Sequence, residues 1–342
     1  MNIAFRVDLG FKRGLGHLTR SLALAERLGK SENFILFYIP FNEYASALIK
    51  KGGFCPIQSK DPDMKLLGYL TNQPETVVIT DVLYPRQKYL AELKKRSLLL
   101  VSLDDLAEAY FPSDIVINGS IERRRYPMDG SAKILAGCKY VIMGEEFMAR
   151  RKERRKFNRE KLTILISLGG SDPNNLTMRV LQIVSEVKDR FHFHLVIGPY
   201  AKRIKEVKQY AKEVVRAQKV FFAPSDLSEI LPKADIAIVS GGRIVYECAF
   251  LGIPMIAVCQ ARHQFPTVRA LARRGCLVAA GCFPCIKSKL LRAKLVELDE
   301  NRNLLKKMSA AGRKIVDGKG GKRVAYFIQD IYEEEIKKSA KA

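Results

Sequence analysis

Residues 236–247 read IAIVSGGRIVYE, in which an apolar run ends at two glycines and a helical pattern follows. The run Ile236–Val239 has no polar alternation, which is typical of a parallel strand buried on both faces of a sheet. Gly241 and Gly242 can turn the backbone tightly and point N–H groups at an anion. This strand–glycine–helix pattern predicts a doubly wound α/β fold with a ligand at the carboxyl end of the strand.

Working outward, similar apolar runs alternate with amphipathic helical patterns along most of the 342 residues. A chain of this length predicts two domains. We expect Rossmann-like domains at 1–150 and 162–342, facing each other across a cleft. The basic stretch 151–161 would join them, either as a solvated linker, which charge runs favour, or as a docking patch. Strands are expected at 3–7, 34–39, 77–80, 98–103, 115–118, 140–143, 162–167, 193–197, 220–222, 236–239 and 254–258.

The composition narrows the class of ligand. The net charge is +23, which favours anionic partners such as phosphorylated substrates, acidic lipid or nucleic acid. The start of the chain enters a strand-like pattern without a signal peptide, and no apolar run is long enough to span a membrane, so we expect a cytoplasmic protein. The seven cysteines fit free thiols. Cys282 and Cys285 have the spacing of half a zinc site but lack a second pair, so we expect no metal.

The turn after the first expected strand contains a histidine at its end. Gly14 and Gly16 allow a close ligand approach, and His17 is expected to act as a general base, with a packing histidine as the alternative. Asp8 is expected to orient His17 or to hydrogen-bond a sugar. Arg20, three residues after His17, is expected to support the loop.

A second glycine turn, SLGGSDPNN at 167–175, follows the first strand of the second half. Gly170, Ser171 and Asn174 are candidates for ligand contact. The alternative is a plain glycine turn in which Asp172 or Asn174 caps the next helix.

Two further strand ends complete the expected site. Gly241 and Gly242 would hold a diphosphate, and Glu247, about one turn further along the helix, would accept the two ribose hydroxyls. The alternative for Glu247 is a surface position, which its apolar neighbours argue against. His263 and Gln264 could reach the sugar or the phosphates, or form an ordinary polar turn.

These motifs occur in an order that resembles a known family. R-x-D, G-x-G-H, S-L-G-G-S-D-P-x-N, S-G-G-x-x-x-Y-E and a late D-G-K-G-x-x-R-V are similar to the UDP-sugar hydrolases of pseudaminic acid biosynthesis and their relatives in spore-coat polysaccharide formation. The resemblance covers nearly the whole chain. It implies the two-domain GT-B fold, a UDP-sugar substrate and a metal-independent reaction without a cofactor. It also implies that His17 activates water, that Glu247 holds the uridine ribose, and that Gly241 and Gly242 bind the diphosphate.

Three departures from the family pattern leave the sugar open. His263 stands where an asparagine is usual, Asp81-Val-Leu-Tyr84 is one residue longer than the usual D-x-Y, and Arg243 replaces a small residue. Hydrolysis of a UDP-linked amino sugar is our first expectation. A GT-B glycosyltransferase that moves the sugar onto a glycan or protein, with its basic surface on an acidic acceptor or membrane face, is the second expectation. A non-catalytic nucleotide- or nucleic-acid-binding protein is the third, although no nucleic-acid motif is present. We expect a monomer.

Overall fold

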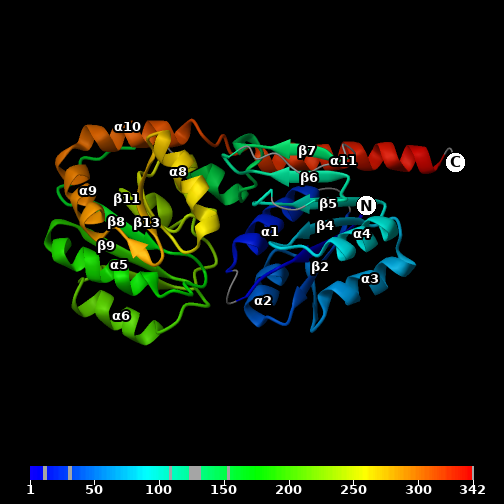
Figure 1. Ribbon diagram of the computed structural model, residues 1–342, viewed down its shortest axis with the longest axis horizontal. Coiled ribbons are helices and arrows are strands. Elements are labelled where there is room, and N and C mark those ends of the chain that lie inside the picture. The colour runs from blue at the N-terminus through cyan, green and yellow to red at the C-terminus, as the bar shows by residue number, and fades with distance from the viewer. Residues whose placement is uncertain (11–13, 30–32, 108–109, 123–131, 152–154, 341–342) are drawn as a thin grey trace. The chain divides into compact units, whose positions relative to one another are not determined.

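The computed structural model describes residues 1–10, 14–29, 33–107, 110–122, 132–151 and 155–340. Its internal contacts divide the chain into two compact units. Unit 1 contains residues 1–9, 17–144 and 318–342, and unit 2 contains residues 10–16 and 145–317. In the described part of the chain each unit is built on one seven-stranded sheet (Figure 1).

The sheet of unit 1 is parallel throughout and has the strand order β3-β2-β1-β4-β5-β6-β7. Helices connect most of its strands, as a doubly wound fold requires. The strands are β1 (Asn2–Val7), β2 (Phe34–Pro40), β3 (Cys55–Ser59), β4 (Val77–Asp81), β5 (Leu99–Leu103), β6 (Ile115–Asn118) and β7 (Lys133–Ala136). The helices are α1 (Gly16–Leu28), α2 (Glu43–Lys51), α3 (Pro62–Asn72), α4 (Gln87–Arg96) and the short η1 (Cys138–Tyr140).

Both faces of this sheet are buried, because alternate side chains of each strand point to opposite sides. Phe5 and Phe37 stack on one face with ring centroids 4.7 Å apart. On the other face, Leu66 of α3 and Leu90 of α4 join the core around Val78. The unalternating apolar runs in the sequence therefore have their cause in burial on two sides.

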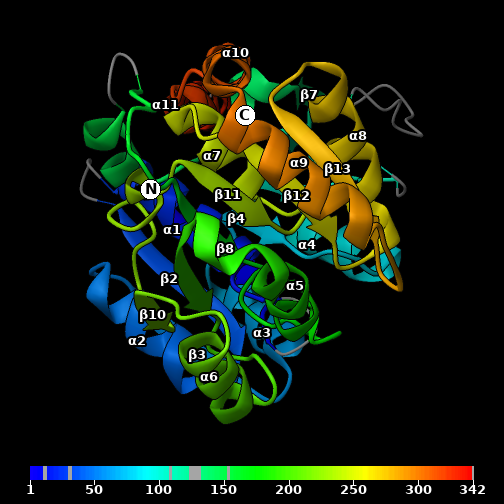
Figure 2. The same cartoon turned by 90° about the vertical axis from the view of Figure 1, so that its left-hand side faces the viewer.

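The sheet of unit 2 repeats this order as β10-β9-β8-β11-β12-β13-β14, and only the last pairing is antiparallel in the described residues. Helix α9 packs against α5 over the core (Figure 2). The strands are β8 (Thr163–Ser167), β9 (His192–Ile197), β10 (Lys219–Phe222), β11 (Ile236–Val239), β12 (Met255–Cys259), β13 (Leu277–Cys282) and β14 (Cys285–Ile286). The helices are η2 (Glu145–Arg150), α5 (Leu176–Val184), η3 (Ser185–Arg190), α6 (Ile204–Glu213), η4 (Leu231–Lys233), α7 (Ile244–Leu251), η5 (Arg262–Gln264), α8 (Phe265–Arg273), α9 (Ser288–Glu300) and α10 (Arg302–Arg313).

The last helix, α11 (Gly320–Ser339), groups with unit 1, whereas the sequence-based boundaries assign 162–342 to the second domain. It runs beside β7, where Lys133 forms an ion pair with Glu334 at 3.6 Å (Figure 1). A side chain at Gly320 would overlap the backbone at Val141. The absence of a Cβ at this residue therefore lets the helix begin against unit 1.

In the basic stretch 151–161, of which residues 152–154 lie outside the described residues, most described side chains are exposed, but the stretch also makes contacts with unit 2. Phe157 is 5% exposed and belongs to the core of unit 2. Arg155 donates to the carbonyl oxygens of Pro232 and Ala234, and Arg159 donates to the Thr163 hydroxyl. One buried aromatic ring and several arginine–carbonyl bonds thus hold the stretch on unit 2.

The expected strand at 140–143 is also wrong. Its first residue ends η1, and Val141, Ile142 and Met143 are buried without entering the sheet. Val141 lies where α11 begins, and the Met143 carbonyl accepts from Arg27 of α1, so this segment contacts helices of unit 1 without pairing as a strand. Strands β3, β7, β13 and β14 were not among the expected ones.

Among the described residues, no helix has the length and apolar character needed to cross a membrane.

Candidate functional site

The two sheets share a feature that determines where ligands can bind. In each, the winding reverses between the first and the fourth strand, at β1/β4 in unit 1 and at β8/β11 in unit 2. Ligands of open α/β sheets bind outside the carboxyl ends of the strands at such a reversal. The expected functional loops follow β1, β8 and β11, and a carboxylate, Asp81, ends β4.

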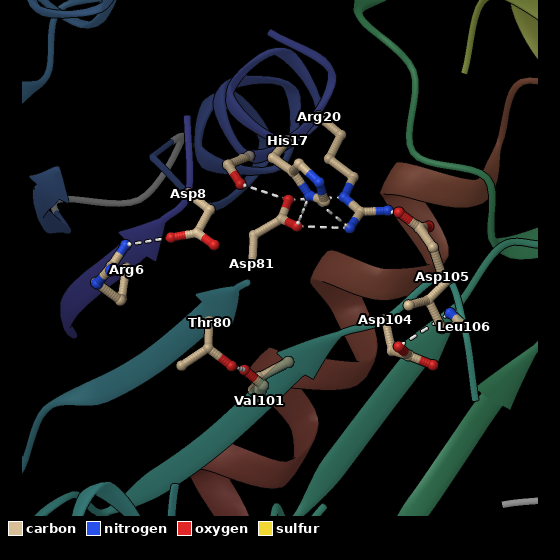
Figure 3. Close-up of polar contacts among 11 residues, drawn as sticks. Arg6, Asp8, His17, Arg20, Thr80, Asp81, Val101, Asp104, Asp105 and Leu106 are labelled. Carbon is tan, nitrogen blue, oxygen red and sulfur yellow. Dashed lines mark hydrogen bonds and ion pairs between the residues drawn. The ribbon is translucent and has the colours of Figure 1, made fainter. Parts of the chain in front are cut away.

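In unit 1, His17 is held by a buried carboxylate. Its Nδ1 lies 2.5 Å from Oδ1 of Asp81, whose side chain is fully buried, while the imidazole remains 11% exposed (Figure 3). A carboxylate accepts hydrogen bonds, so this contact assigns the proton of the neutral ring to Nδ1. Nε2 is then the basic nitrogen, which is the tautomer that a general base needs.

Asp81 receives further hydrogen bonds from the same face of α1. Arg20 donates through Nε at 2.6 Å and through Nη2 at 2.5 Å, and the Ser21 hydroxyl donates at 3.0 Å. His17, Arg20 and Ser21 stand three and four residues apart, so one helical face presents all three donors. Arg20 also donates to Asp105 at 2.5 Å (Figure 3).

The charges in this network keep both carboxylates ionised. Burial opposes ionisation of Asp81, but the Arg20 charge and the hydrogen bonds from Arg20 and His17 hold its pKa below the ordinary value. Burial likewise opposes ionisation of Asp105, and the Arg20 charge lowers its pKa. The pKa of Arg20 is raised because the two carboxylates outweigh the effect of its burial. A permanent anion therefore faces Nδ1 of His17.

The sequence offered Asp8 either as the carboxylate that orients His17 or as a contact to the sugar, and the observed partner of Nδ1 is Asp81. The Asp8 carboxylate pairs instead with Arg6 at 3.3 Å, and the Asp8 backbone N–H donates to the Asp81 carbonyl. Arg13, in the same turn, lies outside the described residues. Asp8 thus lies next to the network without being shown to orient the imidazole.

In unit 2, two glycine loops pack against each other. Gly14 has φ +70°, and a Cβ there would lie 3.8 Å from the Gly170 nitrogen and from the Ser171 hydroxyl. A Cβ at Gly170 would lie 3.2 Å from the Leu15 nitrogen. A side chain at Gly170 would press on the neighbouring loop, and the positive φ of Gly14 favours glycine, so these two glycines serve the approach of one loop to another, whereas the sequence predicted the approach of a ligand.

The polar residues of the turn 167–175 are used largely within the protein. Asp172 caps α5 by accepting from the backbone N–H groups of Leu176 at 2.8 Å and Thr177 at 2.9 Å. Asn174, expected to contact ligand, donates to the Gln260 carbonyl at 2.9 Å. The Gln260 side chain in turn donates to Asp172 at 2.7 Å. This network fixes the loop after β8 to the loop after β12.

The loop after β11 requires a glycine at its first position. A Cβ on Gly241 would lie 2.8 Å from Gln264 Cβ and from Val268 Cγ2, whereas one on Gly242 would meet nothing closer than 3.7 Å. Gln264 accepts from the Gln260 N–H at 2.8 Å and turns its Nε2 towards Gly242. A Cβ at Gly242 would thus make only ordinary contacts, with the Ser240 hydroxyl and the Gln264 amide nitrogen, two groups that can donate to an anion.

Glu247 lies one turn into α7 and is half-buried. Burial raises its pKa to about 7, and the negative charges of Glu146 and Asp226 add to the rise while Arg243 opposes it. Hydrogen bonds donated by a ligand stabilise the ionised form of a carboxylate whose pKa lies near neutral pH. His263 is exposed at the start of η5.

The described residues contain no group of three or more His, Cys, Asp or Glu side chains that could hold a metal. Cys282 and Cys285 face each other across the β13–β14 hairpin as free thiols.

Comparisons with known proteins give this geometry a context. The chain is 27% identical to the spore coat polysaccharide biosynthesis protein SpsG of Bacillus subtilis, over 98% of this chain and 100% of that protein. It is 22% identical to the UDP-2,4-diacetamido-2,4,6-trideoxy-beta-L-altropyranose hydrolase of Campylobacter jejuni, over 80% and 97% of the two chains. This chain is a relative of SpsG and of that hydrolase. An uncharacterized protein of Methanocaldococcus jannaschii is 32% identical over 77% of this chain and 57% of its own length. No protein-family model matches the chain.

Solved structures establish the fold of the SpsG relative. MurG of Acinetobacter baumannii superposes with a TM-score of 0.65 at 14% identity, over 96% of this chain and 99% of that chain. The spinosyn rhamnosyltransferase SpnG, complexed with thymidine diphosphate, gives 0.61 at 11% identity over 96% and 99%. The chain has the two-domain, Rossmann-like GT-B fold, as the sequence predicted.

Sequence reasoning missed four residues of these networks. Asp81 belongs to the lengthened D-x-Y motif and Gln260 to the expected turn of His263 and Gln264, but the sequence predicts no role for these two residues or for Ser21 and Asp105. The position of Asp81 at the end of an apolar run could have indicated a functional role, because ligand-binding residues of α/β sheets lie at the carboxyl ends of strands.

Proposed function

We propose that this SpsG relative hydrolyses a UDP-linked amino sugar to the free sugar and UDP, with His17 as the general base. The observation that carries the proposal is the 2.5 Å contact between His17 Nδ1 and the buried Asp81 carboxylate. An exposed or solvated aspartate would not fix the tautomer of the ring in this way. The sequence relationship to a UDP-sugar hydrolase supports the choice of substrate class.

The reaction would proceed as a displacement at the anomeric carbon. Nε2 of His17 takes a proton from water while the water oxygen forms a bond to the anomeric carbon. The bond from that carbon to the diphosphate oxygen breaks, and its electron pair leaves with UDP. Asp81 stays ionised and stabilises the imidazolium that forms.

Unit 2 would hold the nucleotide. The loop at Gly242, with the Nε2 of Gln264 beside it, suits the diphosphate, and the half-buried Glu247 suits the ribose hydroxyls. Backbone N–H groups at the start of a helix bind phosphate readily. Gly14, Gly16, Gly170 and Ser171 belong to this proposal as the neighbouring loops, and His263 as a possible contact to the sugar.

One assay tests the proposal. The protein is incubated with UDP-sugars, including UDP-linked 2,4-diacetamido sugars, without any acceptor, and UDP and free sugar are quantified. We expect release of both by the wild type and a loss of about 10²–10⁴-fold in His17→Ala with UDP affinity retained. Full activity in His17→Ala would remove the imidazole from the mechanism.

The full-length similarity to a polysaccharide biosynthesis protein favours a second candidate, a glycosyltransferase. An acceptor hydroxyl would then take the place of water, and His17 would deprotonate it. Turnover that appears only when a glycan or protein acceptor is added would support this function over hydrolysis.

A further inference from the structure

Arg243 lies in the loop after β11 and has no role in the function proposed above. It follows Gly241 and Gly242 and immediately precedes α7, with helical backbone angles of φ −59° and ψ −30°. Its backbone carbonyl accepts from the Tyr246 N–H at 2.9 Å, so the helix fixes the residue from its first turn. The backbone of Arg243 is therefore fixed at the end of the loop that would cradle phosphate.

The aliphatic part of Arg243 lies against Gly16. A Cβ on Gly16 would be 3.3 Å from Cδ of Arg243 and 3.8 Å from its Cγ. A side chain at residue 16 would therefore push the arginine aside. Gly16 directly precedes His17 in the sequence. The residue that leaves room for Arg243 is therefore covalently bonded to the proposed general base.

Arg243 also lies close to Glu247 along α7 and interacts with its charge. The two residues are four apart, so they share one face of α7, separated by about 6 Å along its axis. The positive charge of Arg243 acts on the Glu247 carboxylate strongly enough to oppose the rise of its pKa. The arginine thus stands one helical turn before the residue proposed to bind ribose, on the side of the glycine loop.

We propose that Arg243 binds the diphosphate of the nucleotide sugar and neutralises the charge that develops on the departing nucleoside diphosphate. The inference rests on the proposed function. In the substrate the diphosphate is attached to the 5′ position of the ribose. A cation one helical turn from the carboxylate that binds the ribose is therefore close enough to bind the diphosphate. When the anomeric carbon–oxygen bond breaks, its electron pair goes to the leaving diphosphate, which gains one negative charge.

The guanidinium suits this task because its donors form a rigid planar fork that pairs with two phosphate oxygens at once. Donors aimed at developing charge lower the barrier because they need no reorganisation during the reaction. The effect of Arg243 should therefore depend on the phosphates of the ligand and not on its nucleoside.

The test compares the affinities of UDP and uridine for the wild type, Arg243→Gln and Arg243→Lys, by calorimetry for UDP and by ligand-observed NMR titration for uridine. We expect Arg243→Gln to weaken UDP binding about 10- to 100-fold, the range of a lost charge-assisted contact, and to change uridine binding less than about threefold. Arg243→Lys should recover part of the UDP affinity, because the charge is kept and the fork is lost.

A matched control comes from Glu247→Gln, which should weaken UDP and uridine by the same factor because both contain the ribose. Equal losses of UDP and uridine in Arg243→Gln would show a structural role and overturn the inference, as would unchanged UDP affinity. A wild-type protein that binds neither UDP nor any UDP-sugar would instead overturn the proposed function itself.

A double-mutant cycle tests the contact with Gly16. We expect Gly16→Ala to weaken UDP binding a few-fold by displacing Arg243, and to have little further effect in an Arg243→Gln background. Additive losses would show that Gly16 acts independently of Arg243.

Discussion

At the residue scale, the side chain of Asp81 performs two tasks with one charge. It accepts from Nδ1 of His17, and it compensates the guanidinium of Arg20, which is 5% exposed. An uncharged residue in its place would leave Arg20 without one of its two carboxylates and would release the tautomer of His17. Stability and turnover are therefore both expected to depend on this single carboxylate, whereas nucleotide affinity should not.

We predict that Asp81→Asn lowers the turnover number by about 10²–10⁴-fold, because the ring is no longer held with Nε2 as the basic nitrogen. The same change should lower the free energy of unfolding by about 3–5 kcal/mol, the usual effect of breaking a buried ion pair. Steady-state kinetics and chemical denaturation measure the two effects, and calorimetry with UDP should show unchanged affinity.

The matched control for this variant is Asp63→Asn. Asp63 also accepts from arginines of unit 1, at 2.6 Å from Arg6 and 2.6 Å from Arg86, but it does not contact His17. Turnover close to that of the wild type is expected. An equal loss of turnover in both variants would mean that Asp81 acts only through stability.

Glu247 gives a prediction about pH. Its pKa is raised by burial to about 7, and a ribose-binding carboxylate must be ionised to accept two hydroxyl donors. The affinity for UDP-GlcNAc, whose phosphates do not titrate near pH 7, should therefore fall as the pH is lowered from 8 to 6. Calorimetry across this range should give a sloping profile for the wild type and a flat one for Glu247→Gln.

The stability of the ligand-free protein should respond in the opposite sense. Because the pKa in the folded state lies above the ordinary value, the folded chain holds a proton that the unfolded chain releases between about pH 4.5 and 7. The contribution of Glu247 to stability is thus lost as the pH rises through this window. Thermal unfolding of wild type and Glu247→Gln should diverge there, and parallel curves would contradict the assignment.

At the element scale, the sequence predicts strands well where burial is two-sided. The runs at 115–118 and 236–239 match β6 and β11 residue for residue. Strand β3 (CPIQS) carries a proline and polar residues, and β13 (LVAAGC) is interrupted by small residues, so neither shows an apolar run. Asp81 could not be paired with His17 because the order of strands is a tertiary property: β1 and β4 are neighbours in the sheet but not in the chain.

The glycine loop after β11 gives a prediction at this scale. Gly241→Ala should destabilise the protein by about 1–3 kcal/mol and weaken UDP binding, because the new methyl group overlaps Gln264 and Val268 of the loop and helix that follow β12. Gly242→Ala, whose methyl group would make only ordinary contacts, should unfold like the wild type. Thermal unfolding and UDP titration of both variants make the comparison, and equal stability of the two would contradict the packing.

At the scale of the whole molecule, the chain returns from unit 2 to unit 1 after Asp317. Helix α11 has the amphipathic pattern expected of any surface helix, and nothing in that pattern states which sheet it covers. The sequence therefore assigns it to the preceding domain. The deciding residues are Gly320, whose lack of a side chain lets the helix start beside Val141, and Gly321, which lies against the buried Arg27. Such close approaches are visible only in three dimensions.

This crossing predicts a selective effect of truncation. Ending the chain after Asp317 removes α11, whose residues Val324, Ala325, Ile328 and Ile331 are buried in the complete chain. Each large apolar side chain contributes about 1.5–3 kcal/mol when fully buried, so unit 1 should lose much of its stability while unit 2 keeps its own core. Differential scanning calorimetry should show one transition shifted to lower temperature and one retained. Ending the chain after Ser339 removes only residues beyond the helix and should leave both transitions in place, so a loss confined to unit 2 in the longer truncation would contradict the assignment of α11 to unit 1.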